Sequence, residues 1–273
     1  MIVRQPDHDD PEWAAKQEGK FPVDGDALQT IDEDARVIAA DGGVIAVLLM
    51  QAISVDLYKP AYKIYRTVHE IPRGRVNAFA TKSLHLSIRR DGSLSPRKGI
   101  APPVREVLEK YGVRQGLLGH FGKPCTGPKC RCRKRNRKML EETTPLIQKL
   151  DQLYKHYLPT HYRFQRAQVK KAPQCRIPHT AFSSGYVLKQ ARTAYHADGN
   201  LPGGMTAIIC MGSFSGGELV IPRWRVRFPY RPGDLLLFNA EELHGNLTFQ
   251  GERLSAAFFC LRHIADCAGI NNR

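Results

Sequence analysis

Two histidines and one aspartate in the second half of the chain have the side-chain types and the spacing of a metal site. His196 and Asp198 flank Ala197, and His244 follows after several short apolar runs and turn residues. Because a β-strand projects alternate side chains to one face, His196 and Asp198 can bind the same ion. Two imidazoles and one carboxylate leave octahedral positions open for a bidentate co-substrate and oxygen, which suits Fe(II), whereas zinc more often takes a closed tetrahedral set. We therefore predict that these three residues form a catalytic iron site.

A cation follows the last of these ligands. Arg253 stands at the start of the apolar, strand-like run 254–261. A guanidinium can bind a carboxylate through two hydrogen bonds, whereas lysine offers only a point charge. We therefore expect a co-substrate that binds iron at one end and Arg253 at the other, and 2-oxoglutarate has the necessary groups.

These residues and the motifs around them resemble the Fe(II)/2-oxoglutarate dioxygenases, and within them the TET/J-binding-protein branch, in particular its compact fungal members. The motifs are His196-Ala197-Asp198 and residues 214–219, 231–234, 244–245 and 251–255. The resemblance covers the end of the chain well and the rest poorly. It implies a double-stranded β-helix fold, with Fe(II), 2-oxoglutarate and O2 as cofactors, and Arg192 as a second 2-oxoglutarate contact.

The same resemblance implies a substrate class. We expect oxidation of the methyl group of a methylated base in DNA, chiefly 5-methylcytosine to 5-hydroxymethylcytosine and further, and also N6-methyladenine. Such a base must leave the duplex stack to reach the iron. Asn200 is a candidate base-reading amide, although a turn role in residues 198–200 is an equal alternative. Where the animal enzymes have a base-contacting histidine this chain has Leu261, and this departure leaves methyladenine and thymine open.

Two other functions are compatible with parts of the sequence. A protein hydroxylase of the prolyl type shares the His-x-Asp and the distal histidine, but such enzymes usually have lysine where this chain has Arg253. A catalytically inactive nucleic-acid-binding module is the second alternative, and the intact triplet of ligands argues against it.

The elements that must position these residues indicate an α+β protein. Short apolar runs at 206–210, 218–221, 234–238 and 256–259, separated by Gly and Pro, predict a double-stranded β-helix (jelly roll) core over about 175–265, flanked by helices. One helix begins with Thr144 as its cap and Pro145 in its first position. Another is expected over 102–112. We expect strands nearer the N-terminus to extend the sheets.

A strongly basic stretch, residues 119–138, precedes the core and contains no acidic residue. Its Arg133, Lys134 and Arg135 are candidate contacts to the phosphates of a methylated DNA duplex. The same stretch is also typical of a nuclear-localisation signal, and one segment can do both. We therefore expect a nuclear protein that binds DNA.

Three cysteines lie within this basic stretch. Cys125, Cys130 and Cys132 are soft ligands that suggest a structural zinc, with His120, Cys175 or His179 as the fourth ligand. Their spacing fits no standard zinc finger. The alternative is three free thiols whose pKa neighbouring cations lower.

Length and charge set the remaining expectations. The chain has 273 residues and a formal net charge of +15, which favours a polyanionic partner. No apolar run approaches the length of a membrane helix, and the first residues do not resemble a signal peptide. We expect a monomer with one catalytic domain over 41–273. Residues 1–40 are acidic and predict a flexible arm, or alternatively a segment that folds back across the basic surface and competes with a polyanion.

Overall fold

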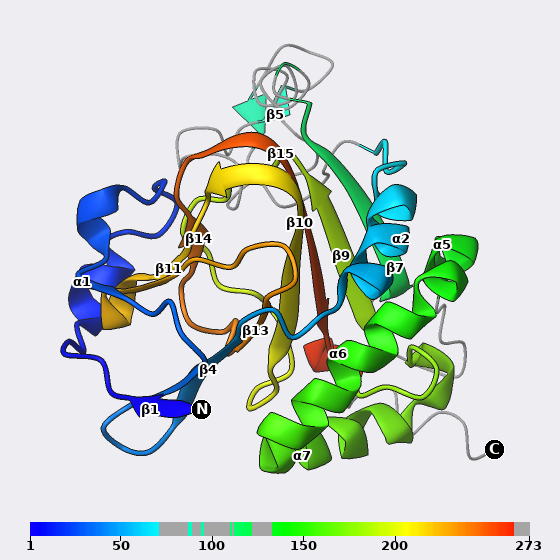
Figure 1. Cartoon of the computed structure of the whole chain (residues 1–273), viewed down its shortest axis with the longest axis horizontal. Coiled ribbons are helices and arrows are strands. Elements are labelled where there is room, and N and C mark those ends of the chain that lie inside the picture. The colour runs from blue at the N-terminus through cyan, green and yellow to red at the C-terminus, as the bar shows by residue number, and fades with distance from the viewer. Residues whose placement is uncertain (71–86, 89–93, 96–109, 111, 122–132, 265–273) are drawn as a thin grey trace.

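The computed structural model describes residues 1–70, 87–88, 94–95, 110, 112–121 and 133–264 (Figure 1). The helices are α1 (Pro11–Ala15), α2 (Val55–Tyr65), α5 (Arg137–Glu142), α6 (Thr144–Tyr157) and α7 (Pro159–Lys171), with short 3-10 turns at Asp24–Asp26, Pro173–Cys175 and Pro222–Trp224. The strands are β1 (Ile2–Arg4), β2 (Gln29–Thr30), β3 (Ala35–Ile38), β4 (Val44–Leu49), β5 (Ser87–Ile88), β6 (Leu94–Ser95), β7 (Arg114–Phe121), β8 (Arg133–Arg135), β9 (Ser184–Lys189), β10 (Thr206–Gly216), β11 (Leu219–Ile221), β12 (Val226–Phe228), β13 (Leu235–Phe238), β14 (Gly245–Asn246) and β15 (Phe249–Phe259).

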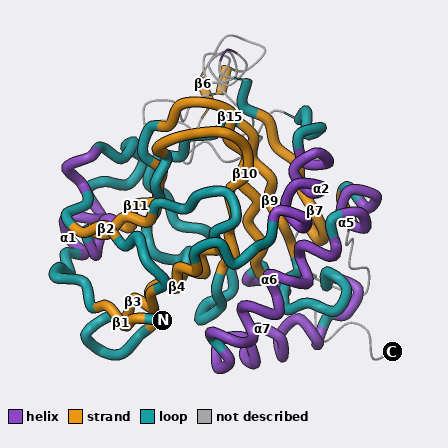
Figure 2. Tube along the Cα trace, in the orientation of Figure 1, coloured by secondary structure: helices purple, strands orange, loops and turns teal. Residues whose placement is uncertain are grey.

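Two sheets form the core. The larger has the strand order β1-β3-β4-β13-β10-β15-β9-β7-β8, and the smaller has the order β14-β11-β12-β2. Antiparallel pairing of β10 with β15 runs from Ala207↔Phe258 to Gly216↔Phe249 and is the longest ladder described. Figure 2 shows β11 on one side of these long strands and helices α2, α5 and α6 on the other. This arrangement confirms the predicted α+β jelly roll.

The sequence of strand β13 is apolar throughout because both faces of the strand are buried. Leu235 and Leu237 belong to the apolar cluster that packs against helices α2 and α6, whereas Leu236 and Phe238 belong to the cluster between the two sheets. Alternate side chains of a strand face opposite ways, so a strand that is covered on both faces must be apolar throughout. The continuous apolar run therefore follows from its position between β4 and β10.

The start of helix α6 differs by one residue from the prediction. Thr144 is its first residue, Thr143 is the N-cap, and Pro145 lies in the first turn. The hydroxyl of Thr143 donates to the carbonyl of Met139 at 2.8 Å, so it caps nothing in α6. The prediction missed this because α5 ends immediately before Thr143, and a threonine between two helices can bind backward instead of forward. The helix expected over 102–112 lies almost wholly outside the described residues.

The acidic N-terminal residues are folded, which differs from the expectation of a flexible arm. Strand β1 pairs with β3, β3 pairs with β4, and β2 pairs with β12. Ile31, Ala35 and Val37 are buried in the cluster between the sheets. The physical reason is that apolar residues of this segment are buried and its strands are paired, while Asp9 and Asp24 add exposed contacts to arginines 223 and 227. The alternative, in which the segment folds back across the basic surface and competes with a polyanion, stays a prediction.

None of the helices in the described ranges is both long and apolar enough to cross a membrane.

Candidate metal centre

His196 and His244 lie side by side because the chain segments that carry them form a two-residue antiparallel bridge. The backbone N–H of each histidine donates to the carbonyl of the other at 3.0 Å, and the ring centroids are 4.4 Å apart. Asp198 reaches the same point, and one possible ligand atom from each of the three residues lies within 4.8 Å of the other two. In the part of the chain that the structure describes, this is the one group of three or more such side chains close enough to share an ion.

Hydrogen bonds orient both imidazoles for metal binding. Nδ1 of His196 lies 2.8 Å from the carbonyl of Ala194, and Nδ1 of His244 lies 2.9 Å from the carbonyl of Glu242. A carbonyl can only accept, so each Nδ1 carries the proton and each Nε2 keeps its lone pair. Metal-binding histidines are commonly oriented in this way.

Asp198 completes the group from two residues after His196. Its Oδ1 lies 3.8 Å from Nε2 of His196, and its side chain is 12% exposed. Its backbone N–H donates to the carbonyl of Ala240 at 2.8 Å, which ties the first two ligands to the loop before the third. Two neutral imidazoles and one carboxylate, all nearly buried, fit the donor set of an Fe(II) site with open positions.

A small cavity of about 50 Å³ opens beside the three ligands, inside the barrel. Its polar lining comes from Thr193, Thr206, Asn246 and Ser255, together with Tyr186. We did not predict these residues as site residues. The sequence could have indicated Ser255 as a site residue, because it lies two positions after Arg253 on a strand and so faces the same way.

Arg253 is a buried cation without a carboxylate partner among the residues that the structure describes. It is 2% exposed, its Nη1 donates to the carbonyl of Ala191 at 3.0 Å, and its Nε has no partner. The guanidinium lies among the rings of Phe214, Tyr230 and Phe249. Burying an unpaired charge is costly, so this site fits a ligand carboxylate.

A short polar chain connects Arg253 to the cavity. Nη2 of Arg253 donates to the hydroxyl of Tyr230, and Nδ2 of Asn246 donates to the same oxygen at 2.7 Å. Burial raises the pKa of Tyr230, so the hydroxyl stays protonated. Gly217 leaves room for the guanidinium: its φ is +79°, and a Cβ there would lie 3.1 Å from Nε of Arg253. Through Tyr230 and Asn246, Arg253 is thus linked to the cavity that the three possible metal ligands line.

Two further predicted residues, Arg192 and Asn200, do not line this cavity. Arg192 donates to the carbonyls of Asn246 and Pro22 and stacks on Phe21. Asn200 is 7% exposed, and its Nδ2 donates to the hydroxyl of Thr206 at 2.9 Å. Asn200 therefore contacts the cavity only indirectly, by fixing a residue that lines it.

The basic and cysteine-rich stretch is described only at its ends. Arg133, Lys134 and Arg135 form strand β8, which pairs with β7 at the edge of the large sheet. Cys125, Cys130 and Cys132 lie outside the described residues, so the zinc site stays a prediction. Of the fourth ligands considered, His120 is 2% exposed and Cys175 is buried, and both line a second cavity, whereas His179 is exposed.

The chain is similar in sequence to one known protein family and to several known proteins. Residues 120–262 match the model of a family described as Tet_JBP, oxygenase domain of the 2OGFeDO superfamily. The chain is 36% identical over 150 residues to the bifunctional helicase and thymine dioxygenase JBP2 of Trypanosoma brucei brucei, covering 51% of this chain and 14% of that protein. It is 29% identical over 150 residues to the thymine dioxygenase JBP1 of the same organism, covering 52% of this chain and 18% of that protein.

A solved structure of NgTET1 in complex with 5mC DNA has the same fold. Its TM-score is 0.57 at 12% sequence identity, and the superposition covers 96% of this chain and 83% of that one. At this identity the likeness shows the fold alone.

Proposed function

The chain belongs to the Tet_JBP family of 2-oxoglutarate and Fe(II)-dependent oxygenases, and from this premise we propose that it oxidises the methyl group of a methylated base in DNA. The proposed substrate is 5-methylcytosine, oxidised to 5-hydroxymethylcytosine and further, with N6-methyladenine as a second substrate. The observation that carries the proposal is the nearly buried triplet His196, Asp198 and His244, with both imidazoles oriented through Nδ1. Tyr230 and Asn246 link this site to Arg253, which is buried without a carboxylate partner among the described residues.

Each part of the chain has a defined task in this reaction. His196, Asp198 and His244 would hold Fe(II), which together with 2-oxoglutarate and O2 supplies an oxidant for a methyl C–H bond. The carbonyls of Ala194 and Glu242 keep the imidazole Nδ1 protons in place, so both Nε2 atoms remain available. Arg253 would bind the far carboxylate of 2-oxoglutarate, and the apolar walls of the cavity exclude water.

The DNA partner is supported by charge. The net charge of +15 and the run Arg133–Arg135 favour a polyanion, and the relatives named above include two enzymes called thymine dioxygenases. Those relatives are much longer than the region that this chain matches, so their whole activities are not transferred. A substrate in chromosomal DNA would also place the protein in the nucleus.

The decisive experiment uses Fe(II)-loaded protein, 2-oxoglutarate and matched duplexes that carry 5-methylcytosine, N6-methyladenine or only thymine. Mass spectrometry of the digested nucleosides identifies the oxidised base. We expect hydroxymethylcytosine from the first duplex and none from a His244→Ala control. Oxidised thymine alone would overturn 5-methylcytosine as substrate. Unchanged nucleosides with 2-oxoglutarate-dependent succinate would overturn the DNA assignment in favour of an RNA substrate or of the protein hydroxylase.

A further inference from the structure

Residues 9–26, here called the strap, cross the outside of both chain segments that carry the histidine ligands. Beside His196, the N–H of Gly19 donates to the carbonyl of Tyr195, and the N–H of Tyr195 donates to the carbonyl of Lys20, both at 2.8 Å. The hydroxyl of Tyr195 donates to Asp26 at 3.0 Å. The residue immediately before one metal ligand is therefore bound to the strap through its backbone and its side chain.

The strap also contacts the second ligand segment. A Cβ placed on Gly245 would lie 2.8 Å from Cγ of Pro22 and 3.1 Å from the backbone of Ala194. Pro22 therefore packs at the point where Gly245 passes close to Ala194. Since no side chain fits between them, the strap and the two ligand segments form one close-packed unit.

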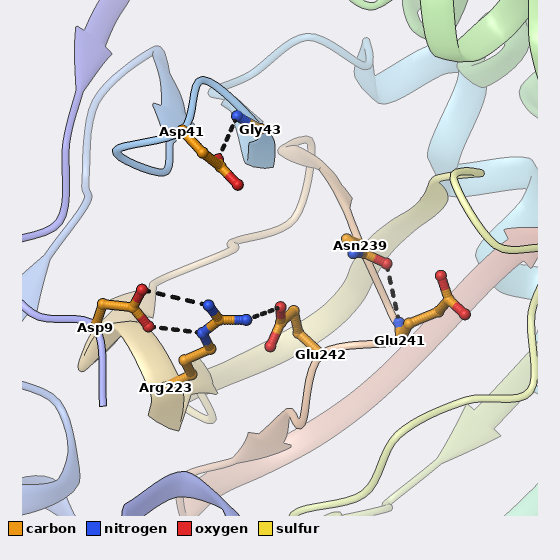
Figure 3. A network of polar contacts seen from close by, with 7 residues as sticks. All are labelled: Asp9, Asp41, Gly43, Arg223, Asn239, Glu241 and Glu242. Carbon is orange, nitrogen blue, oxygen red and sulfur yellow. Dashed lines mark hydrogen bonds and ion pairs between the residues drawn. The ribbon is translucent and has the colours of Figure 1, made fainter. Parts of the chain in front are cut away.

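Arg223 provides the third connection, and Figure 3 shows it between two carboxylates. Its Nε lies 2.7 Å from Oδ1 of Asp9 and its Nη2 lies 3.3 Å from Oδ2, while its Nη1 lies 3.1 Å from Oε1 of Glu242. The guanidinium also stacks on the ring of Trp224, 4.4 Å from its centroid. One arginine thus joins the strap to the loop that carries His244.

Glu242 links Arg223 to His244. Its side chain binds Arg223, and its carbonyl accepts the Nδ1 proton of His244 at 2.9 Å. The same loop is fixed at its start, where the N–H of Asn239 donates to Ile45 at 3.0 Å and Oδ1 of Asn239 accepts from Glu241 at 3.1 Å. A shift of Glu242 would therefore rotate the imidazole of His244.

We propose that the strap positions the two histidine ligands, and that Arg223 is the positioning residue through which Asp9 and Glu242 fix the ring of His244. This inference rests on the iron site of the proposed function. The side chains of Arg223, Asp9 and Glu242 are 34%, 50% and 23% exposed, and a cavity of about 330 Å³ borders them. Exposed ion pairs of this kind add little to folding stability, so the expected effect is on the geometry of the metal site.

The chain offers a matched control in Arg227. Its side chain is 33% exposed, and it contacts the strap at Asp24, 3.6 Å away, and also Thr30. It thus resembles Arg223 in charge, exposure and contact with the strap, but the contacts described for it do not include the loop of His244. If the strap were only a cover for the sheet, Arg223→Gln and Arg227→Gln would have equal effects.

The test is a titration of the metal-free full chain with Co(II), followed through the visible absorption bands of the bound ion. We expect Arg223→Gln to raise the Co(II) dissociation constant about tenfold and to shift the bands, as loss of groups that orient metal ligands commonly does. Arg227→Gln should stay within about twofold of the unmodified protein, and both variants should melt at similar temperatures without metal. Arg223→Lys should recover part of the affinity, because lysine can pair with one carboxylate at a time.

Two results would overturn the proposal: an Arg223→Gln variant with unchanged affinity and spectrum, or equal losses in both variants. If Arg223→Gln does not fold, Asp9→Asn tests the same connection, since it keeps the arginine and removes the negative charge of its partner in the strap. Unchanged Co(II) binding in Asp9→Asn would then refute the proposal. Failure of the unmodified protein to bind Co(II) is a different outcome, because it would refute the iron site itself.

Discussion

His196 and His244 exchange a pair of backbone hydrogen bonds, each 3.0 Å long, so their separation is set by the backbone before any ion binds. The residues that follow and flank this pair must therefore tolerate a very close approach of two chain segments. Preorganised ligands lose little freedom when they bind a metal, and any side chain that separates the segments should weaken binding.

Gly245→Ala should lower metal affinity. The added Cβ would lie 2.8 Å from Pro22 and 3.1 Å from the backbone of Ala194, so the segments must move apart. We expect a loss of at least about tenfold in Co(II) affinity, which is typical when the support of a metal ligand is disturbed. Gly199→Ala is the control, since a Cβ there meets nothing within 4 Å although Gly199 directly follows Asp198. Equal affinities of the two variants would contradict the close-packing argument.

Arg253→Gln should weaken 2-oxoglutarate binding. Removal of one partner of a buried, hydrogen-bonded charge pair costs about 2–5 kcal/mol, so the dissociation constant should rise by at least about thirtyfold. Calorimetry with Co(II)-loaded protein under anaerobic conditions measures it without turnover. Arg192→Gln should change it by less than about twofold, because Arg192 is held by the carbonyls of Asn246 and Pro22 and by the ring of Phe21, whereas Nε of Arg253 has no partner. A large effect of Arg192→Gln would restore its predicted role as a 2-oxoglutarate contact.

Stability should fall as the pH drops from about 6.5 toward 4, and His120 should be one cause. Burial, with a further effect of His263, lowers the pKa of His120 to about 4. Between these values the unfolded chain binds a proton that the folded chain rejects, so the stability present near pH 7 is lost as the pH falls. The full effect is at most about 3 kcal/mol. Urea unfolding of His120→Leu should show a weaker loss between pH 7 and 5, and His156→Leu, at an exposed position of α6, should not differ from the unmodified protein.

Neutralising Arg133, Lys134 and Arg135 together should reduce the salt dependence of DNA binding. Each lost phosphate contact lowers the slope of log affinity against log salt concentration by about 0.9 on duplex DNA. A decrease of about 2 to 3 in fluorescence-anisotropy titrations would support DNA contact by all three. An unchanged slope would favour a different role for these charges. Strand β8 lies at the edge of its sheet, where charged residues discourage pairing with other chains.

The candidate iron ligands His196 and Asp198 and the central strands could be predicted from sequence because their signals are local. His196 and Asp198 are separated by one residue, and the apolar runs that became β10, β11, β13 and β15 have lengths and boundaries that strands require. His244 was found through its motif, and no spacing rule would have placed its ring 4.4 Å from that of His196. The pairing of the two histidines is a property of the sheet topology.

The folded state of the strap and the role of Asn200 could not be predicted from local sequence signals. An acidic segment with few large apolar residues satisfies the composition rule for disorder, and that rule ignores the strands and the apolar cluster with which the N-terminal residues pack. Arginines 223, 225 and 227 all contact it from the core. For Asn200, the sequence showed an amide after a glycine, and only the structure shows that the amide is buried against Thr206.

The position of β4 also bears on the shortest fragment of this protein that we expect to fold alone. The region that matches the family, residues 120–262, contains all three metal ligands but excludes β4, whose pairing with β13 runs from Leu49↔Leu235 to Ala46↔Phe238. A recombinant piece cut at the family boundary would expose the apolar faces and the unpaired backbone of β13 to solvent. Such an edge promotes self-association, so we expect a stable fragment to need more residues than the region that matches the family.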